Sequence, residues 1–173
     1  RVVISSGDKD LSQLVNEQVT MVDTMNGKRR DVAGVLAEFG VLPERMLDFQ
    51  TLVGDAVDNV PGVPKVGPKT AAKWLQEYGS LENLLAHAGD IKGVAGENLR
   101  QSLDWLPTAR LLLRIKTDCD LGSHLTTWPG LEALVLDAPQ DELLSDFYQR
   151  YGFKSLAARS VAPSRPSAIA PPG

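Results

Sequence analysis

The sequence predicts an α/β fold that is predominantly helical, in which the end of a parallel sheet is followed by a helical subdomain. The apolar run Val2–Ser5 is typical of a strand inside a parallel sheet that is covered on both faces. Strand-like alternation returns at Val19–Thr24, and few other segments could pair with these two. From residue 31 onward, apolar residues at helical spacing and Gly or Pro boundaries predict a succession of helices.

Composition limits the classes of protein that this chain can belong to. Its 173 residues are 43% hydrophobic, enough for the core of one domain or of one domain with a tail. A net charge of −4 argues against coating nucleic acid by bulk attraction, so any basic surface must be local. The single Cys119 excludes an internal disulfide framework, and no apolar run approaches the roughly 18 residues of a membrane span. We therefore expect a cytoplasmic protein without a membrane partner.

Two aspartates follow the first predicted strand. Asp8 and Asp10 lie at its carboxyl end, where open α/β sheets bind ligands, and at this spacing they share a face. Such a pair could hold a divalent cation. The alternative is that Asp8 caps the short helix that follows and Asp10 is solvated, and the spacing alone leaves both open.

A hairpin and two helices are predicted next. Asn26-Gly27 is a hairpin signal, and the basic run 28–30 behind it is either a solvated turn or a DNA contact. Asp31 has the position of an N-cap for a helix over 32–39 that Gly40 closes. Pro43 opens a further helix that runs to about Val53.

A second acidic pair, Asp55 and Asp58, occupies the turn after Gly54, and at a separation of three their side chains can converge. Capping is the alternative for these residues as well. The turn over 60–67 resembles a helix-hairpin-helix, in which apolar residues pin the hairpin and glycines let the backbone approach a phosphate. A nucleotide-binding P-loop is excluded, because Pro68 stands where that loop has its lysine.

Further helices are predicted over 68–78 and 80–85, then over 99–116 with an interruption at Pro107. Between them, 86–96 is predicted as a loop. A short strand or an extended packing segment is expected within 128–137, and an amphipathic helix over 139–151. The two histidines, His87 and His124, lack partners at metal-ligand spacing and are interpreted as structural.

Two segments together resemble one known family. They are Ser6–Leu11 with Gln13-Leu14, and Gly54–Val63 followed by Val66–Ala71. Both are similar to the 5′ nuclease domain of bacterial DNA polymerase I, a member of the flap endonuclease family. The resemblance covers residues 1–157. It implies that 1–30 are the last strands of the nuclease core with part of its metal site, and that 31–157 form a helical DNA-binding subdomain with the helix-hairpin-helix at 52–78.

The resemblance also implies a function and a set of site residues. The function is structure-specific 5′-3′ exonuclease or flap endonuclease cleavage of branched or flapped duplex DNA in replication and repair, in the bacterial cytoplasm at the nucleoid. Two Mg²⁺ or Mn²⁺ ions about 4 Å apart would hydrolyse the phosphodiester. The implied catalytic metal ligands are Asp8, Asp10, Asp55 and Asp58. The implied DNA contacts are Gly62, Lys65, Gly67, Lys69 and Thr70, and the implied backbone ligands of a K⁺ ion are Val60, Val63 and Val66.

The sequence departs from the family in lacking its earlier part, with the remaining acidic ligands and the arch that threads the 5′ end. We therefore expect a fragment that is inactive or nearly so by itself. The Pro-, Ala- and Ser-rich segment 158–173 is predicted to be a linker to proofreading and polymerase domains downstream. The alternative function is a non-catalytic helix-hairpin-helix DNA-binding module, in which the aspartates are caps.

Overall fold

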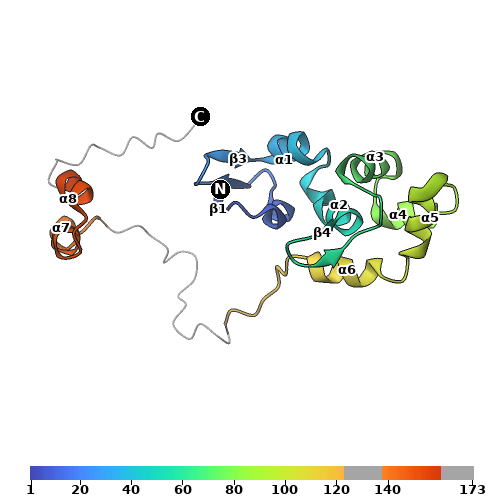
Figure 1. Cartoon of the computed structure of the whole chain (residues 1–173). Helices are drawn as coiled ribbons and strands as arrows, with labels where there is room; N and C mark the ends of the chain where they lie inside the picture. The colour runs from blue at the N-terminus through green and yellow to red at the C-terminus, as the bar shows by residue number, and fades with distance from the viewer. Residues whose placement is uncertain (123–137, 161–173) are drawn as a thin grey trace. The chain divides into compact units, whose positions relative to one another are not determined.

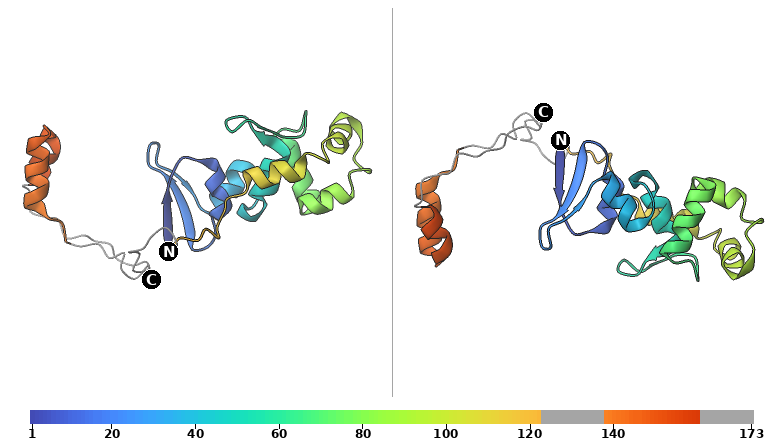
Figure 2. Two further views of the ribbon diagram at one scale, coloured as in Figure 1. Left: turned by 90° about the horizontal axis from the view of Figure 1, so that it is seen from below. Right: turned by 90° about the horizontal axis from the view of Figure 1, so that it is seen from above.

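The computed structural model describes residues 1–122 and 138–160 (Figure 1). These residues belong to two units, Arg1–Cys119 and Asp120–Gly173. In the first unit a small sheet lies at one end and helices α4 and α5 lie at the other (Figures 1 and 2). No helix among the described residues combines the length and the apolar character that crossing a membrane requires.

A three-stranded sheet forms the first part of the chain. Strand β1 (Val2–Ser5) runs parallel to β2 (Val19–Asp23), which pairs antiparallel with β3 (Lys28–Arg30). The 3-10 helix η1 (Lys9–Leu14) connects the two parallel strands. The predicted strands and hairpin are thus confirmed, and so is the α/β fold class. Burial of β1 on both faces is not observed, since Val2 and Val3, whose side chains point to opposite faces of the strand, are 55% and 66% exposed. Strand β1 is also the edge strand of this sheet.

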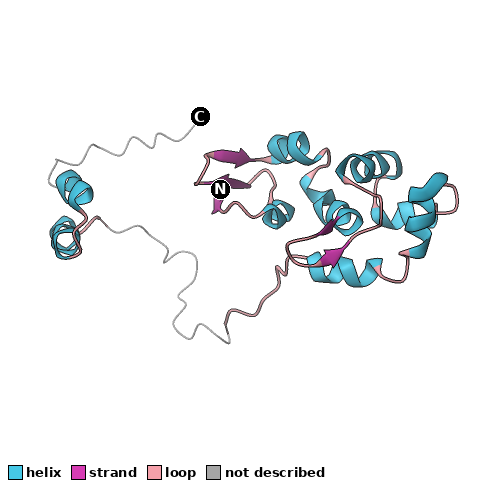
Figure 3. Cartoon of the chain, in the orientation of Figure 1, coloured by secondary structure: helices cyan, strands magenta, loops and turns pink. Residues whose placement is uncertain are grey.

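The helices of the first unit follow mostly as the caps predict (Figure 3). Asp31 accepts a hydrogen bond from the Gly34 N–H at the start of α1, and Gly40 ends α1 in the left-handed conformation. The segment predicted as one helix from Pro43 is a 3-10 turn continued by α2. The bounds of the helices are α1 Val32–Phe39, η2 Pro43–Arg45, α2 Met46–Val53, α3 Pro68–Tyr78, α4 Leu81–Ala86, α5 Gly93–Gln101 and α6 Leu106–Leu113.

The predicted loop over 86–96 is wrong from Gly93 onward, where α5 begins. Gly96 suggests a loop in the sequence, but it lies inside the helix, where a β-carbon would be 2.1 Å from the Ile91 carbonyl oxygen. Glycine is needed at this position because two pieces of backbone touch, so it does not indicate an irregular segment.

One apolar core crosses the predicted boundary at residue 30. It joins Val15 and Met21, on the sheet side, to Val35, Leu52 and Trp74 on the helices. Helix α1 follows β3 directly and packs on it, so the sheet and the helices of the first unit share this core. The first unit ends at Cys119, and the functional division at residue 30 stays a prediction.

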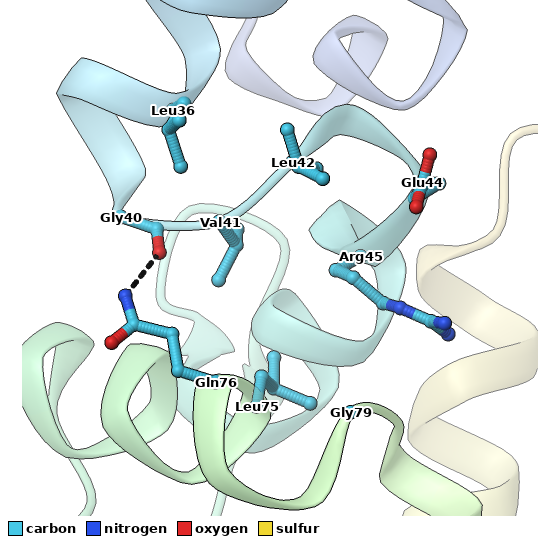
Figure 4. A pocket seen from close by; sticks show the side chains of 9 residues that line it. All are labelled: Leu36, Gly40, Val41, Leu42, Glu44, Arg45, Leu75, Gln76 and Gly79. Atoms are coloured by element: carbon cyan, nitrogen blue, oxygen red, sulfur yellow. Dashed lines mark hydrogen bonds between the residues drawn. The ribbon is translucent and has the colours of Figure 1, made fainter.

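An apolar hollow of about 320 Å³ lies between α1, the segment 41–45 and α3 (Figure 4). Leu36, Leu42 and Leu75 line it, and the Gln76 side chain donates a hydrogen bond to the Gly40 carbonyl oxygen at its edge, at 3.0 Å. None of the predicted site residues lines this hollow.

The second unit contains α7 (Asp141–Arg150) and α8 (Lys154–Ser160), which pack together. Phe147 lies 6.1 Å from Phe153 in a stacked arrangement, centroid to centroid. Helix α8 extends three residues into the segment that was predicted as linker. The remainder of that segment, 161–173, lies outside the described residues, as do the expected strand over 128–137 and His124.

Candidate metal centre and DNA-binding turn

Three of the four predicted carboxylates meet. Asp10, Asp55 and Asp58 each offer an oxygen, and these oxygens lie within 4.8 Å of one another. Asp10 comes from η1, and the other two come from β4 (Gly54–Asp55) and the turn that joins it to β5 (Val60–Pro61). The Asp55 carboxylate accepts hydrogen bonds from the N–H groups of Val57, at 2.9 Å, and of Asp58, at 3.4 Å. The tight turn therefore orients Asp55 from its own backbone.

Asp8 lies near the other three but has a different environment. Its carboxylate accepts a hydrogen bond from the Asp10 N–H at 3.0 Å and so caps η1, as the alternative interpretation proposed. Asp8 also lines the cleft that contains the three carboxylates. Capping and a place in the cleft are compatible, because the cap uses one carboxylate oxygen.

The cleft has a volume of about 420 Å³ and also contains a lysine that the sequence interpretation missed. The Lys9 ammonium group hydrogen-bonds to the Asp55 carboxylate and lies 3.7 Å from that of Asp10. The Lys9 hydrogen bond holds the pKa of Asp55 below its ordinary value. Burial, together with the charges of Asp8 and Asp55, raises the pKa of Asp10 even though Lys9 opposes this. Two adjacent acids therefore have pKa values that are displaced in opposite directions.

The donor set of the cleft suits a hard divalent cation. Carboxylate oxygens are the protein ligands that Mg²⁺, Mn²⁺ and Ca²⁺ prefer. Asp55 is buried and Asp10 half-buried, whereas Asp58 is exposed, so an ion held here would keep access to water. That Lys9 lies between two of these carboxylates shows that their spacing accommodates positive charge.

An ion pair also lines the cleft. Arg30 donates two hydrogen bonds to the Glu38 carboxylate, at 2.7 and 3.2 Å, and Lys28 lies 2.8 Å from the same group. The hydrogen bonds from Arg30, and to a smaller extent that from Lys28, lower the pKa of Glu38. Arg30 is only 7% exposed. Of the basic run 28–30, this residue is therefore neither solvated nor accessible to direct contact with DNA.

The Glu38→Gln variant is expected to lose about 1–3 kcal/mol of unfolding free energy at pH 7, because a charge-assisted pair becomes a neutral contact. The folded-state pKa of Glu38 is below its ordinary value of 4.5. The stabilisation that the ionised Glu38 carboxylate contributes is therefore complete above its ordinary pKa. It is lost as the pH falls through the folded-state pKa. Urea unfolding at pH 7 and pH 3 checks this. The exposed Glu44→Gln is the control, and an equal loss at both pH values would contradict the prediction.

The predicted helix-hairpin-helix turn is held against the core by its apolar residues. Val60, Val63 and Val66 are buried. The Val63 N–H bonds to the Leu52 carbonyl oxygen at 2.8 Å, and the Val66 N–H to that of Val63 at 3.1 Å. In this four-residue turn Lys65 has a φ of +67°, with Pro64 before it. That is the pattern of a type II turn, whose third position favours glycine.

The two glycines of the turn differ in their surroundings. A β-carbon on Gly62 would lie 2.3 Å from the Val53 carbonyl carbon, so glycine is needed there for packing against α2. A β-carbon on Gly67 would meet nothing within 4 Å. Gly67 is the N-cap of α3 and contributes no side-chain cap, so the first-turn N–H groups near Lys69 and Thr70 suit an anion.

Two side chains farther along the chain hold the turn, and no pattern in the sequence indicates either contact. The Trp105 indole N–H donates to the Pro61 carbonyl oxygen at 2.7 Å. The Asn98 amide donates to the Pro64 carbonyl oxygen, also at 2.7 Å. The turn therefore depends on contacts from α5 and from the start of α6.

Comparison with known proteins decides the family. The sequence profile of the family described as "5′-3′ exonuclease, C-terminal SAM fold" matches residues 41–134, more than half of the chain. The chain belongs to the 5′-3′ exonuclease family. Members of this family are nucleases, hydrolases that act on DNA. The predicted resemblance is confirmed, and with it the helical, SAM-like character of the exonuclease fold.

The relatives of this chain include DNA polymerases I and a shorter 5′-3′ exonuclease. It is 42% identical over 159 residues to a DNA polymerase I of Rhizobium leguminosarum, which covers 91% of this chain and 15% of that protein. It is 41% identical over 121 residues to a 5′-3′ exonuclease of Aquifex aeolicus, covering 70% of this chain and 41% of that one. The chain thus spans less than half the length of each of these relatives.

Solved structures show the same fold. The exonuclease of bacteriophage T5, with divalent metal ions (zinc) bound, matches 65% of this chain and 42% of its own at a TM-score of 0.61 and 21% identity. A T5 flap endonuclease complex with DNA and metal ions matches 92% of this chain and 52% of its own, with a TM-score of 0.61 and 16% identity.

Proposed function

We propose that this chain is part of a metal-dependent, structure-specific 5′ nuclease that cuts branched or flapped duplex DNA during bacterial replication and repair. The observation that carries the proposal is the convergence of Asp10, Asp55 and Asp58 within 4.8 Å. These carboxylates come from parts of the chain more than forty residues apart. Caps that serve only their own helices would have no reason to meet.

The carboxylates of Asp10, Asp55 and Asp58, with Asp8 at the cleft wall, would hold Mg²⁺ or Mn²⁺. Two such ions, when bound, supply an attacking water of lowered pKa and neutralise charge on the leaving oxygen. Lys9 offsets part of the negative charge of the cluster. A phosphodiester that carries its own negative charge therefore meets less repulsion when it enters the cleft.

The turn after the acidic cluster would hold the DNA. Lys65, Gly67 and Lys69 are exposed, and the uncapped start of α3 offers N–H groups beside them. Together with Thr70 and the backbone at Gly62, they would contact phosphates and fix position without selecting sequence. A K⁺ ion bound by the carbonyl oxygens of Val60, Val63 and Val66 would strengthen the binding of the DNA phosphates at this turn.

By itself the chain is proposed to cleave DNA weakly or not at all. Each of two divalent cations would need six oxygen ligands, but only three clustered carboxylates are present among the described residues. Water would therefore fill most of the coordination positions. In the cell we propose that the chain works at the nucleoid in the cytoplasm, together with proofreading and polymerase domains downstream in the same natural chain.

The test is Asp55→Asn, with Asp104→Asn as control because Asp104 is exposed and lies outside the cleft. Calorimetry should show that Asp55→Asn loses Mn²⁺ binding. In the complete nuclease, flap cleavage with Mg²⁺ should fall at least about 100-fold while duplex binding persists. If Asp55→Asn left both Mn²⁺ binding and cleavage unchanged, the non-catalytic DNA-binding module would be the better description.

The Lys65→Gly variant is expected to change stability and DNA binding in opposite directions. Glycine relieves the positive φ of +67° and should raise the unfolding free energy by about 0.5–1 kcal/mol. Loss of one phosphate contact should weaken duplex binding and reduce the salt slope of log K by about 1. Thermal unfolding and binding at several salt concentrations measure both, and unchanged DNA affinity would contradict a phosphate contact at Lys65.

A further inference from the structure

The side chain of Gln50, on α2, connects the metal centre to the interior of the protein. It is 2% exposed. Its Nε2 donates a hydrogen bond to Oδ1 of Asp10, and its Oε1 accepts one from Nε2 of Gln13 at 2.8 Å. A buried amide must satisfy its polar atoms within the protein, so these two contacts fix its place.

The orientation of Gln13 is set in turn by the main chain at the end of α6 and just after it. Its Nε2 also donates to the Leu113 carbonyl oxygen at 2.8 Å, and its Oε1 accepts from the Ile115 N–H at 3.3 Å. If the Gln13 amide were reversed, its oxygen would face a carbonyl oxygen and its NH₂ group would face an N–H. The backbone thus determines which end of Gln13 faces Gln50.

The orientation of Gln13 determines that of Gln50 beside the metal centre. With Nε2 of Gln13 directed at it, Gln50 must turn its oxygen toward Gln13 and its NH₂ group toward Asp10. Reversal of Gln50 would place two donors together at one end and an oxygen against a carboxylate at the other. One oxygen of Asp10 is therefore held by a donor whose direction is fixed from a distant backbone segment.

Asp10 needs this support more than its neighbour does. Asp55 is oriented by N–H groups of its own turn. For Asp10 the corresponding donor on its carboxylate is the Gln50 amide. We propose that Gln50, locked by Gln13, is a positioning residue that presents the Asp10 carboxylate to the divalent cation. This inference rests on the proposed function and deepens it, because it assigns the groups that support one ligand.

The experiment compares Gln50→Met, which keeps the length and buried volume but removes the donor, with Thr51→Val as matched control. Thr51 is the next residue of α2, is equally buried, and its hydroxyl group donates a hydrogen bond to the Leu47 carbonyl oxygen of its own helix. Calorimetry with Mn²⁺ on the whole chain should show about 10–100-fold weaker binding in Gln50→Met, the usual cost of losing such support, and little change in Thr51→Val.

A second readout needs no metal. In spectra of the apo protein, Asp10→Asn should shift the side-chain amide resonances of Gln50 strongly and those of Gln76, which bonds elsewhere, very little. Unchanged Mn²⁺ affinity in Gln50→Met, an equal loss in Thr51→Val, or Gln50 resonances that ignore Asp10→Asn would each overturn the positioning role. If the wild-type chain binds no Mn²⁺ while the resonances do respond, the proposed metal function itself is overturned, and the positioning role with it.

Discussion

Replacing Gly62 with alanine is expected to destabilise the protein by at least about 3 kcal/mol. The added β-carbon would lie 2.3 Å from the Val53 carbonyl carbon, 2.4 Å from the Gly54 nitrogen and 2.5 Å from the Leu52 carbonyl oxygen. All three are backbone atoms, so no side chain can rotate away to make room. Relief requires that the turn separate from the end of α2, which breaks the hydrogen bond between Val63 and Leu52.

The control is Gly67→Ala in the same turn, where the new methyl group meets nothing within 4 Å. Urea unfolding followed by circular dichroism should place Gly67→Ala within about 0.5 kcal/mol of the wild type. A Gly62→Ala variant within 1 kcal/mol of the wild type would contradict the close approach that the structure shows. DNA affinity of Gly67→Ala is informative in addition, since a phosphate at this position would meet the methyl group.

Arg110→Met is expected to lower the unfolding free energy by about 2–4 kcal/mol. Asp48 is 2% exposed, and Arg110 is its nearest cationic partner, at 2.9 Å. Removing the guanidinium group leaves a buried carboxylate with the Leu81 N–H and with Arg45, whose nitrogen is 3.7 Å away. The cost arises mainly from the charge that is left inside the protein.

A double-mutant cycle separates that cost from the loss of packing. Adding Asp48→Asn to Arg110→Met removes the stranded charge but keeps an oxygen for the Leu81 N–H. The double variant should therefore be more stable than Arg110→Met alone in chemical denaturation. A further loss of stability on adding Asp48→Asn would show that the carboxylate does not need its arginine.

Local signals in the sequence were sufficient for most elements of the first unit. Asp31 and Gly40 bound α1, Pro68 opens α3, and Ser80 caps α4 through the Asn83 N–H, because each of these effects acts within one turn of backbone. Gly96 misled for the opposite reason, since its role depends on a contact with Ile91 that composition does not reveal.

The candidate site could be predicted only in part. The carboxylates Asp10, Asp55 and Asp58 were predicted as ligands because two sequence segments together resemble the 5′ nuclease family, whereas the spacing of either acidic pair left capping open. Residue spacing could not decide between cap and ligand for Asp8, since both uses favour the same position. Lys9 and Gln50 reach carboxylates 46 and 40 residues away in the sequence. Only the packing of η1 against α2 brings such partners together.

The carbonyl oxygens of Pro61 and Pro64 are held by Trp105 and Asn98, which lie 44 and 34 residues downstream. A peptide of residues 52–78 carries every side chain that would touch a phosphate, yet it lacks both of these braces. Transplanted into another protein, such a segment would sample many conformations. The smallest portable version of the proposed DNA-binding turn therefore extends at least to Trp105.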